Sequence, residues 1–169
     1  GDVYKRQHPE LRFDIVGKAP DQRLQQAAAH WQGITLKGFV PDLQRIYNDS
    51  RVSVAPLLFG SGMKVKVLDA MARGMPTVTT SVGAEGIDME SGKHLLVADE
   101  PSDMAMQIDR LLTDPDLWRC LQTNSRALIT ERYTWRQLFN GMHRALDAGL
   151  RGKASAINNQ TDTRLQHAG

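Results

Sequence analysis

The segment 52–79 constrains the fold most, because an apolar strand, a glycine loop, a helix and a second strand follow one another there. The strands are expected over 52–58 and 77–79. The helix between them begins near Met63 and ends by Gly74, where glycine adopts a left-handed C-cap at low cost. An α/β sheet presents a helix N-terminus to an anion in this way, since the first-turn N–H groups have no intrahelical partners.

The glycine loop and the residues after it carry the chemistry of this segment. Gly60 and Gly62 let the backbone approach a phosphate closely, and Lys64 adds a positive charge in the first helical turn. A cation there opposes the helix dipole, at a cost of roughly 0.3–1 kcal/mol that a bound anion offsets. The same residues also fit a plain turn, with Ser61 as the N-cap and Lys64 in solvent. Both a phosphate site and a structural turn remain open on these residues alone.

Composition excludes several classes of protein. The chain has 169 residues, enough for one domain with a core, and a net charge of +2 gives no general affinity for nucleic acid. It contains no long apolar run, so we expect no transmembrane helix, and no signal peptide is visible. The single cysteine, Cys120, cannot form an internal disulfide and is expected to be a small core residue. A cytoplasmic location follows as the default.

Strands and helices alternate along the chain, which predicts an α/β fold with a Rossmann-like, doubly wound parallel sheet and a helical C-terminus. A polar, glycine-rich loop is expected over 80–92. Residues 1–7 resemble a translated sequencing adapter and are expected to be a non-native extension, whereas 151–169 read as a disordered tail after a single domain over 8–150. The remaining strands are expected over 11–16, 34–36 and 94–97, and the remaining helices over 21–31, 42–48, 101–112, 115–131 and 134–150.

The candidate site lies where strands end. Ligands of doubly wound sheets bind outside the carboxyl ends of the strands. Four stretches occupy such positions, and each of them contains glycine: 17–18, 38–40, 60–64 and 80–87. Two of them also carry a lysine. The first strand is not followed by Gly-x-Gly-x-x-Gly, so a dinucleotide-binding fingerprint is absent from that position.

Five motifs, taken together, resemble the C-terminal domain of retaining glycosyltransferases of family 4, also called group 1. They are Asp-Ile-Val-Gly at 14–17, Lys-Gly-Phe-Val at 37–40, the segment 56–80, Gly-Ala-Glu-Gly at 83–86 and Tyr-Thr-Trp at 133–135. The resemblance runs in order from His8 to Gly149. It implies the GT-B fold, in which two Rossmann-like domains face a cleft and the C-terminal one binds the nucleotide-sugar donor.

The resemblance also implies roles for single residues. The diphosphate cradle would consist of Gly60, Ser61, Gly62 and Lys64, and Lys64 would act catalytically by stabilising the departing nucleoside diphosphate. Asp69 matches the second acid of the family's Glu-x7-Glu motif, which binds the ribose hydroxyls. The base would pack at Phe39 and Val40, with Gly17 at the end of the first strand, and Glu85 would lie near the sugar pocket.

Two of these residues also have simpler interpretations, and one position departs from the family's common pattern. Asp69 could pair with Lys66 on a solvated helix face, and Glu85 could be an ordinary loop acid. Ser61 stands eight residues before Asp69, where the common pattern has its first acid. The spacing Gly-x-Gly-x-Lys-x-Lys over 60–66 is typical of one branch of the family.

The resemblance implies a fragment of a retaining hexosyltransferase that acts in polysaccharide biosynthesis with a UDP- or GDP-sugar. It suggests no cofactor and no essential metal. A sugar or lipid-linked acceptor would be held by an N-terminal domain absent from this chain, and the full-length enzyme could associate peripherally with a membrane. The fragment alone would bind nucleotide without turnover. Two alternatives stay open: a non-catalytic nucleotide-binding module of Rossmann type, and a GT-B sugar-nucleotide epimerase.

Overall fold

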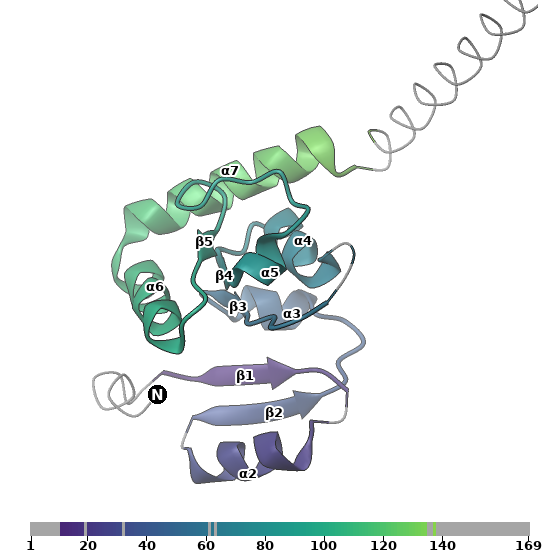
Figure 1. Cartoon of the computed structure of the whole chain (residues 1–169), viewed down its shortest axis with the longest axis vertical. Coiled ribbons are helices and arrows are strands. Elements are labelled where there is room, and N and C mark those ends of the chain that lie inside the picture. The colour runs from purple at the N-terminus through teal and green to yellow at the C-terminus, as the bar shows by residue number, and fades with distance from the viewer. Residues whose placement is uncertain are drawn as a thin grey trace, which may run out of the picture. The chain divides into compact units, whose positions relative to one another are not determined.

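A computed structural model describes residues 11–18, 20–31, 33–60, 62, 64–134 and 137. The order of helices and strands follows the sequence expectation closely (Figure 1). By compactness the chain divides after Arg126. The elements are β1 (Phe13–Val16), α2 (Gln22–His30), β2 (Ile34–Gly38), α3 (Gln44–Asn48), β3 (Ser53–Ala55), α4 (Val65–Ala72), β4 (Thr77–Thr79), α5 (Ser81–Ala84), β5 (Leu96–Val97), α6 (Pro101–Thr113) and α7 (Pro115–Arg132).

All described strand pairs are parallel, which confirms the predicted α/β class. The strands form two sheets, one with the order β1-β2 and one with the order β3-β4-β5. Phe13 pairs with Ile34 in the first sheet, and Val78 pairs with both Val54 and Leu96 in the second. The single sheet that the sequence predicts is therefore present as two parallel parts over the described residues.

In the described part of the chain, β1 and β3 are outer strands of their sheets, each paired on one side. The N–H of Phe13 donates to the carbonyl of Gly33 on the β2 side, and the N–H of Ser53 donates to the carbonyl of Pro76 on the β4 side. Because a strand alternates the direction of its peptide groups, those of Asp14 and Val54 point to the opposite edges. Within the described ranges, no strand pairs with β1 or β3 on those edges.

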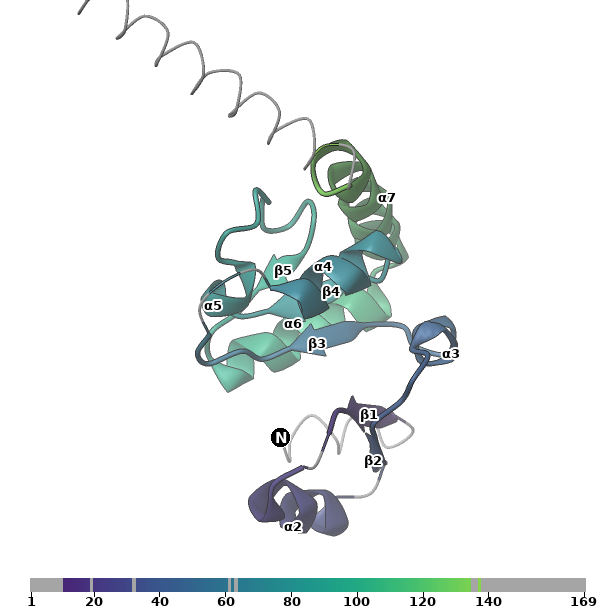
Figure 2. The ribbon, with the colours of Figure 1, turned by 90° about the vertical axis from the view of Figure 1, so that its right-hand side faces the viewer.

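The three-stranded sheet is the best-packed part of the molecule. All residues of β4 are buried, and Figures 1 and 2 show α4 and α6 on opposite sides of this sheet. The core cluster takes side chains from β4, β5, α6 and α7, namely Val78, Leu96, Leu111 and Leu121. Met104, Ile108 and Leu117 pack against it, as the helical periodicity predicts.

The two-stranded sheet carries α2, which contacts β2. Asp21 caps this helix by accepting a hydrogen bond from the N–H of Leu24 at 2.7 Å, so Pro20 precedes the cap instead of starting the helix. Helical spacing predicts that Leu24, Ala28 and Trp31 face the core, but Leu24 and Trp31 are 37% and 42% exposed. No described residue of α2 is buried, so the periodicity overestimates how far this face is covered.

Three further expectations need correction or fall outside the description. Cys120, expected in the core, is exposed on α7. The polar segment 80–92 contains the short helix α5 instead of loop throughout. The predicted extension 1–7, the tail 151–169 and nearly all of the predicted helix 134–150 lie outside the described residues. Over the part of the chain that is described, no helix has both the length and the apolar character needed to cross a membrane.

Polar contacts connect α7 to residues next to β3 and α4. The indole N–H of Trp118 donates to the carbonyl of Arg51 at 2.7 Å, and the guanidinium of Arg51 lies 4.6 Å from the centre of the Trp118 ring system. Arg126 donates to the carbonyl of Arg73 at the end of α4, at 2.8 Å. These bonds join α7 to the residues just before β3 and just after α4. The candidate site lies between these two places, at the end of β3 and the start of α4.

Candidate functional site

The glycine loop after β3 adopts backbone conformations that glycine favours. Gly60 has a φ of +140° and Gly62 a φ of +94°, values that side chains with a Cβ rarely adopt. Ser61 and Met63, between and after them, lie outside the described residues. These φ angles alone favour glycine at positions 60 and 62, whether or not the loop binds a phosphate.

Lys64 occupies the N-cap position of α4, so this helix begins at Val65 and not near Met63. The carbonyl of Lys64 accepts the first helical hydrogen bonds, from the N–H groups of Val67 and Leu68. This excludes Ser61 as the cap of α4. The N–H groups of Val65 and Lys66 precede the first intrahelical bond, and they lie at the positive end of the helix dipole.

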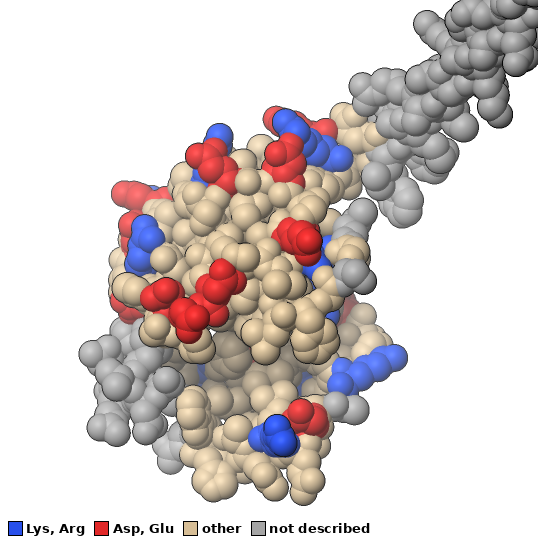
Figure 3. Space-filling model, in the orientation of Figure 1, with Lys and Arg blue, Asp and Glu red and all other residues tan. Residues whose placement is uncertain are grey.

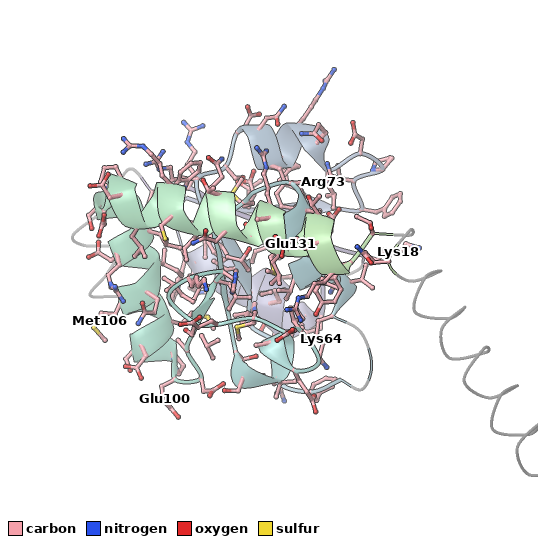
Figure 4. All side chains as sticks on the ribbon, turned by 90° about the horizontal axis from the view of Figure 1, so that it is seen from above. Lys18, Lys64, Arg73, Glu100, Met106 and Glu131 are labelled. Atoms are coloured by element: carbon pink, nitrogen blue, oxygen red, sulfur yellow. The ribbon has the colours of Figure 1, made fainter. Side chains whose placement is uncertain are left out.

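The side chain of Lys64 is buried, with only 5% of its surface exposed. Its Nζ donates a hydrogen bond to the carbonyl of Gly60, so the ammonium group folds back onto the glycine loop (Figure 4). An ammonium group has three N–H donors, and one carbonyl uses one of them. Of the two open interpretations, the one with Lys64 in solvent at a plain turn does not fit the structure, because the ammonium group is buried and bonded to the loop.

Glu85 lies opposite Lys64, at the C-cap of α5. Its Oε2 is 3.8 Å from the Lys64 Nζ, and 73% of the glutamate side chain is exposed. Helix α5 itself is fixed at its start, where Thr80 accepts from the N–H of Gly83 and donates to the carbonyl of Leu57 at 2.5 Å. Asp99 accepts from both the N–H and the hydroxyl of Ser81, and these bonds lower the pKa of Asp99.

The charge on the surface near α6 is mainly negative. On the face that Figure 3 shows, acidic side chains gather at the start of α6, where Asp99, Glu100 and Asp103 are exposed. The lysines and arginines described on this face are scattered over it. Proteins that bind a nucleic-acid backbone carry clustered cations along one stripe or patch. This face does not have that character.

A second group of predicted residues lies at the carboxyl ends of β1 and β2. The N–H of Gly17 donates to the carbonyl of Gly38 at 2.9 Å, and Phe39 is 64% exposed beside the half-buried Val40. The ammonium group of Lys18 lies 5.2 Å from the centre of the Phe39 ring. A pocket of about 200 Å³ opens here, lined by Ile15, Val16, Gly17, Lys18, Pro20, Leu24, Leu36 and Gly38.

Lys18 is exposed, as its interpretation as a solvated lysine predicts, but its contact with the Phe39 ring was not predicted. The ammonium group lies over this ring at the mouth of the pocket. The signal was present in the sequence: a lysine directly after a strand and its glycine occupies the same kind of position as Lys64. The position of Phe39, one strand further on, could not be inferred from spacing alone.

Asp69 belongs to a different cluster, on α4. Its carboxylate accepts from the Nε of Arg73 at 3.0 Å, so its partner on the helix is Arg73 and not the expected Lys66. Arg73 also donates to the side-chain oxygen of Gln44 on α3 at 2.5 Å, and its guanidinium lies 5.1 Å from the ring centre of Tyr47. The cluster joins α3 to α4. Asp69 therefore helps to hold these two helices together even when no ligand is bound.

Tyr47 makes this cluster sensitive to alkaline pH. The pKa of Tyr47 is raised from 10.0 to about 12, mainly by burial and also by the negative charge and hydrogen bond of Asp69, while the positive charge of Arg73 opposes the rise. The folded state therefore keeps its proton above pH 10, where the unfolded chain loses it. We expect a stabilising contribution that is fully present below pH 10 and is lost as the pH rises toward 12.

Urea unfolding at several pH values between about 9 and 11.5 tests this expectation. The free energy of unfolding should fall more steeply in the natural chain than in Tyr47→Phe, which has no proton to lose. Tyr133→Phe, at a tyrosine outside this cluster, should keep the slope of the natural chain. Equal slopes in the natural chain and Tyr47→Phe would contradict the assignment.

The structure brings some predicted site residues together and leaves others apart. Lys64 contacts Gly60 and Glu85, and Gly17 and Phe39 lie at neighbouring strand ends. Asp69 contacts Arg73, and no contact with Lys64 is described for it. In the described part of the chain, no group of three or more His, Cys, Asp or Glu side chains is placed to hold a metal ion.

The sequence matches one protein-family model and a curated relative. Residues 2–114 match the family model described as "Glycosyl transferases group 1". An uncharacterised 44.6 kDa protein in the cps region of Klebsiella pneumoniae is 26% identical over 144 residues. That match covers 81% of this chain and 37% of the relative, so the chain spans little more than a third of the length of this curated relative.

Solved structures agree on the fold. The C-terminal domain of a glycosyl transferase group 1 family protein (LpcC) from Francisella tularensis superposes with a TM-score of 0.67 at 20% identity, covering 79% of this chain and 75% of that domain. Anabaena Alr3699/HepE, crystallised with UDP and glucose, gives a TM-score of 0.75 at 17% identity, with 86% of this chain and 43% of that chain covered. The described fold is that of GT-B C-terminal domains.

Proposed function

Because the chain belongs to the group 1 glycosyl transferases and has the fold of their C-terminal domain, we propose that it binds the diphosphate of a nucleotide sugar at Gly60–Lys64. The observation that carries the proposal is the buried ammonium group of Lys64, held at the start of α4 by a loop of positive-φ glycines. Among the described residues, the ammonium group donates one hydrogen bond, to Gly60, so its other N–H donors could bind oxygen atoms of a ligand.

In this function Lys64 and the first N–H groups of α4 act on the leaving group. When the bond between sugar and diphosphate breaks, negative charge develops on the departing phosphate oxygen. Fixed donors that already point at this oxygen stabilise the transition state without having to reorganise. Lys64 is held in place before the ligand arrives, because its stem is buried and its ammonium group is bonded to Gly60.

The nucleoside part is assigned to the second group of residues. Gly17, Phe39 and Val40 lie at the carboxyl ends of β1 and β2, and the open ring of Phe39 offers a surface for a flat base. In a doubly wound sheet these strand ends and those of β3 and β4 border the same crevice. Binding of the ribose by Asp69 would require its carboxylate to share or release a bond to Arg73 or Tyr47.

The whole enzyme is proposed to be a retaining glycosyltransferase whose acceptor is held by an N-terminal domain. A sugar or lipid-linked acceptor, and a role at the cytoplasmic face of a membrane, suit a relative named for a cps region. UDP is the first nucleotide to test, because the Anabaena structure contains UDP and glucose. The chain of 169 residues should bind donor without transferring its sugar.

Calorimetric titration with UDP, GDP and ADP tests the proposal. Lys64→Met keeps an apolar stem of similar length while removing the charge, and should weaken binding of the preferred nucleotide by about tenfold to a hundredfold. Lys93→Met is the matched control, at an exposed lysine paired with Glu90 on the loop before β5, and should change the affinity less than about twofold.

Circular dichroism should show that both variants fold. A Lys64→Met variant that is folded and binds as tightly as the natural chain would exclude the proposed diphosphate site. Saturable binding in this chain, without sugar transfer by the full-length enzyme on any acceptor, would favour a non-catalytic nucleotide-binding module.

A further inference from the structure

The two side chains of the Lys64–Glu85 ion pair differ strongly in their exposure to solvent, and this difference affects how the site binds a charged ligand. The lysine is enclosed, with 5% of its side chain exposed, whereas the glutamate is 73% exposed. Glu85 ends α5 and is followed by Gly86, whose φ of +76° turns the backbone away. The cation is therefore fixed, and the carboxylate is free to rotate toward it or into solvent.

The contact between the two groups is electrostatic. A separation of 3.8 Å between Nζ and Oε2 is longer than a hydrogen bond, whereas the bond from Nζ to the Gly60 carbonyl fixes the ammonium group. An ion pair with one exposed partner is weak. A phosphate oxygen at hydrogen-bonding distance can therefore replace Glu85 as the partner of Lys64, without breaking the bond that positions it.

Displaced from Lys64, the carboxylate still remains near the ligand, because it is attached at the end of a fixed helix. Thr80 and Asp99 hold the start of α5, and Gly83 packs against Thr79. The salt bridges of the described residues give Glu85 no other basic partner. Its negative charge then acts on whatever anion Lys64 has bound.

We propose that Glu85 distinguishes the donor from the product by charge, and so weakens the binding of the product. This inference rests on the proposed diphosphate site at Lys64. In a nucleotide sugar the terminal phosphate is esterified to the sugar. In the free nucleoside diphosphate the same phosphate carries a second ionisable oxygen, with a pKa near 6, and hence more negative charge near neutral pH. Glu85 repels that added charge.

The consequence is a site that binds the product less tightly than Lys64 alone would allow. Product release limits the rate of many enzymes that bind their substrates through charged groups. A carboxylate beside the leaving phosphate repels both ligands, but it raises the free energy of the bound product more than that of the esterified donor, which carries less charge there. Glu85 is thus a specificity-determining residue, and Lys64 remains the group that binds the phosphate.

Titration of the 169-residue chain with UDP and with UDP-glucose tests the inference. Glu85→Gln removes the charge and keeps the shape of the side chain. We expect it to tighten UDP binding by about threefold to tenfold and UDP-glucose binding by a clearly smaller factor, because the esterified phosphate carries less charge. Glu90→Gln, at an exposed glutamate paired with Lys93 at 3.4 Å, is the matched control and should alter neither affinity.

The possible failures separate the inference from the function on which it rests. Lys64-dependent binding of both ligands, with an unchanged ratio of their affinities in Glu85→Gln, overturns the inference alone. An equal gain for both ligands also overturns it, since the effect would then be a general attraction of anions. If neither ligand binds in a manner that depends on Lys64, the proposed function falls and the inference falls with it.

Discussion

Gly83→Ala is expected to destabilise the chain by more than about 3 kcal/mol. A Cβ at this position would lie 2.0 Å from the Oγ1 and 3.3 Å from the Cβ of Thr79. Thr79 cannot move away easily, because it is fully buried in the central strand β4 and its hydroxyl donates to the carbonyl of Ala55 at 2.8 Å. Either that hydrogen bond breaks or α5 leaves the sheet.

Chemical denaturation measures this effect, and two further variants isolate its cause. Gly17→Ala adds the same methyl group where no atom lies within 4 Å, and should change the free energy of unfolding by less than about 0.5 kcal/mol. The double variant Gly83→Ala with Thr79→Ala removes the clashing oxygen, so it should be less destabilised than the sum of the single variants. Strict additivity would show that the contact with Thr79 is not the cause.

Met71→Ala should cost about 2–5 kcal/mol, the second-largest expected effect. Met71 has no exposed surface and lies on the buried face of α4 with Val67 and Ala70. Truncation leaves a cavity behind the helix that begins beside Lys64, so nucleotide binding should weaken along with stability. Met106→Ala, at a methionine that is 55% exposed on α6, should have almost no effect on either. Equal losses in the two variants would contradict the burial of Met71.

The segment 52–79 could be predicted from sequence because its signals are local. The glycine loop, the C-cap at Gly74 and Pro76 act within a few residues of one another. Strand β4 covers the predicted residues, and β3 lies inside the predicted range 52–58 but is shorter. Lys64 was identified as the important residue of the loop. Its burial was not, since a lysine next to a glycine loop is as compatible with solvent as with an enclosed position.

The incorrect predictions concern residues whose structure depends on contacts with residues far away in the sequence. Helix α5 was missed because its first turn is stabilised by Asp99, 18 positions further along the chain. Asp69 pairs with Arg73 because Arg73 also finds Gln44 and Tyr47 on α3, partners that Lys66 does not reach. Cys120 and Trp31 have the periodicity of core residues but are exposed, because periodicity defines a helix face without showing what covers it.

Over the described residues, β1 and β3 each have one edge on which no strand pairs, so we expect the behaviour of this chain to depend on its concentration. A row of unpaired peptide groups can accept a strand from another copy, and natural sheets discourage this with charged side chains on the edge. β1 carries one charged residue, Asp14, which forms an ion pair at 3.5 Å with Lys37 of the neighbouring strand β2. The residues of β3, Ser53–Ala55, carry no charge. Self-association during expression and purification should therefore begin at β3, and a charged residue introduced there would be the first remedy.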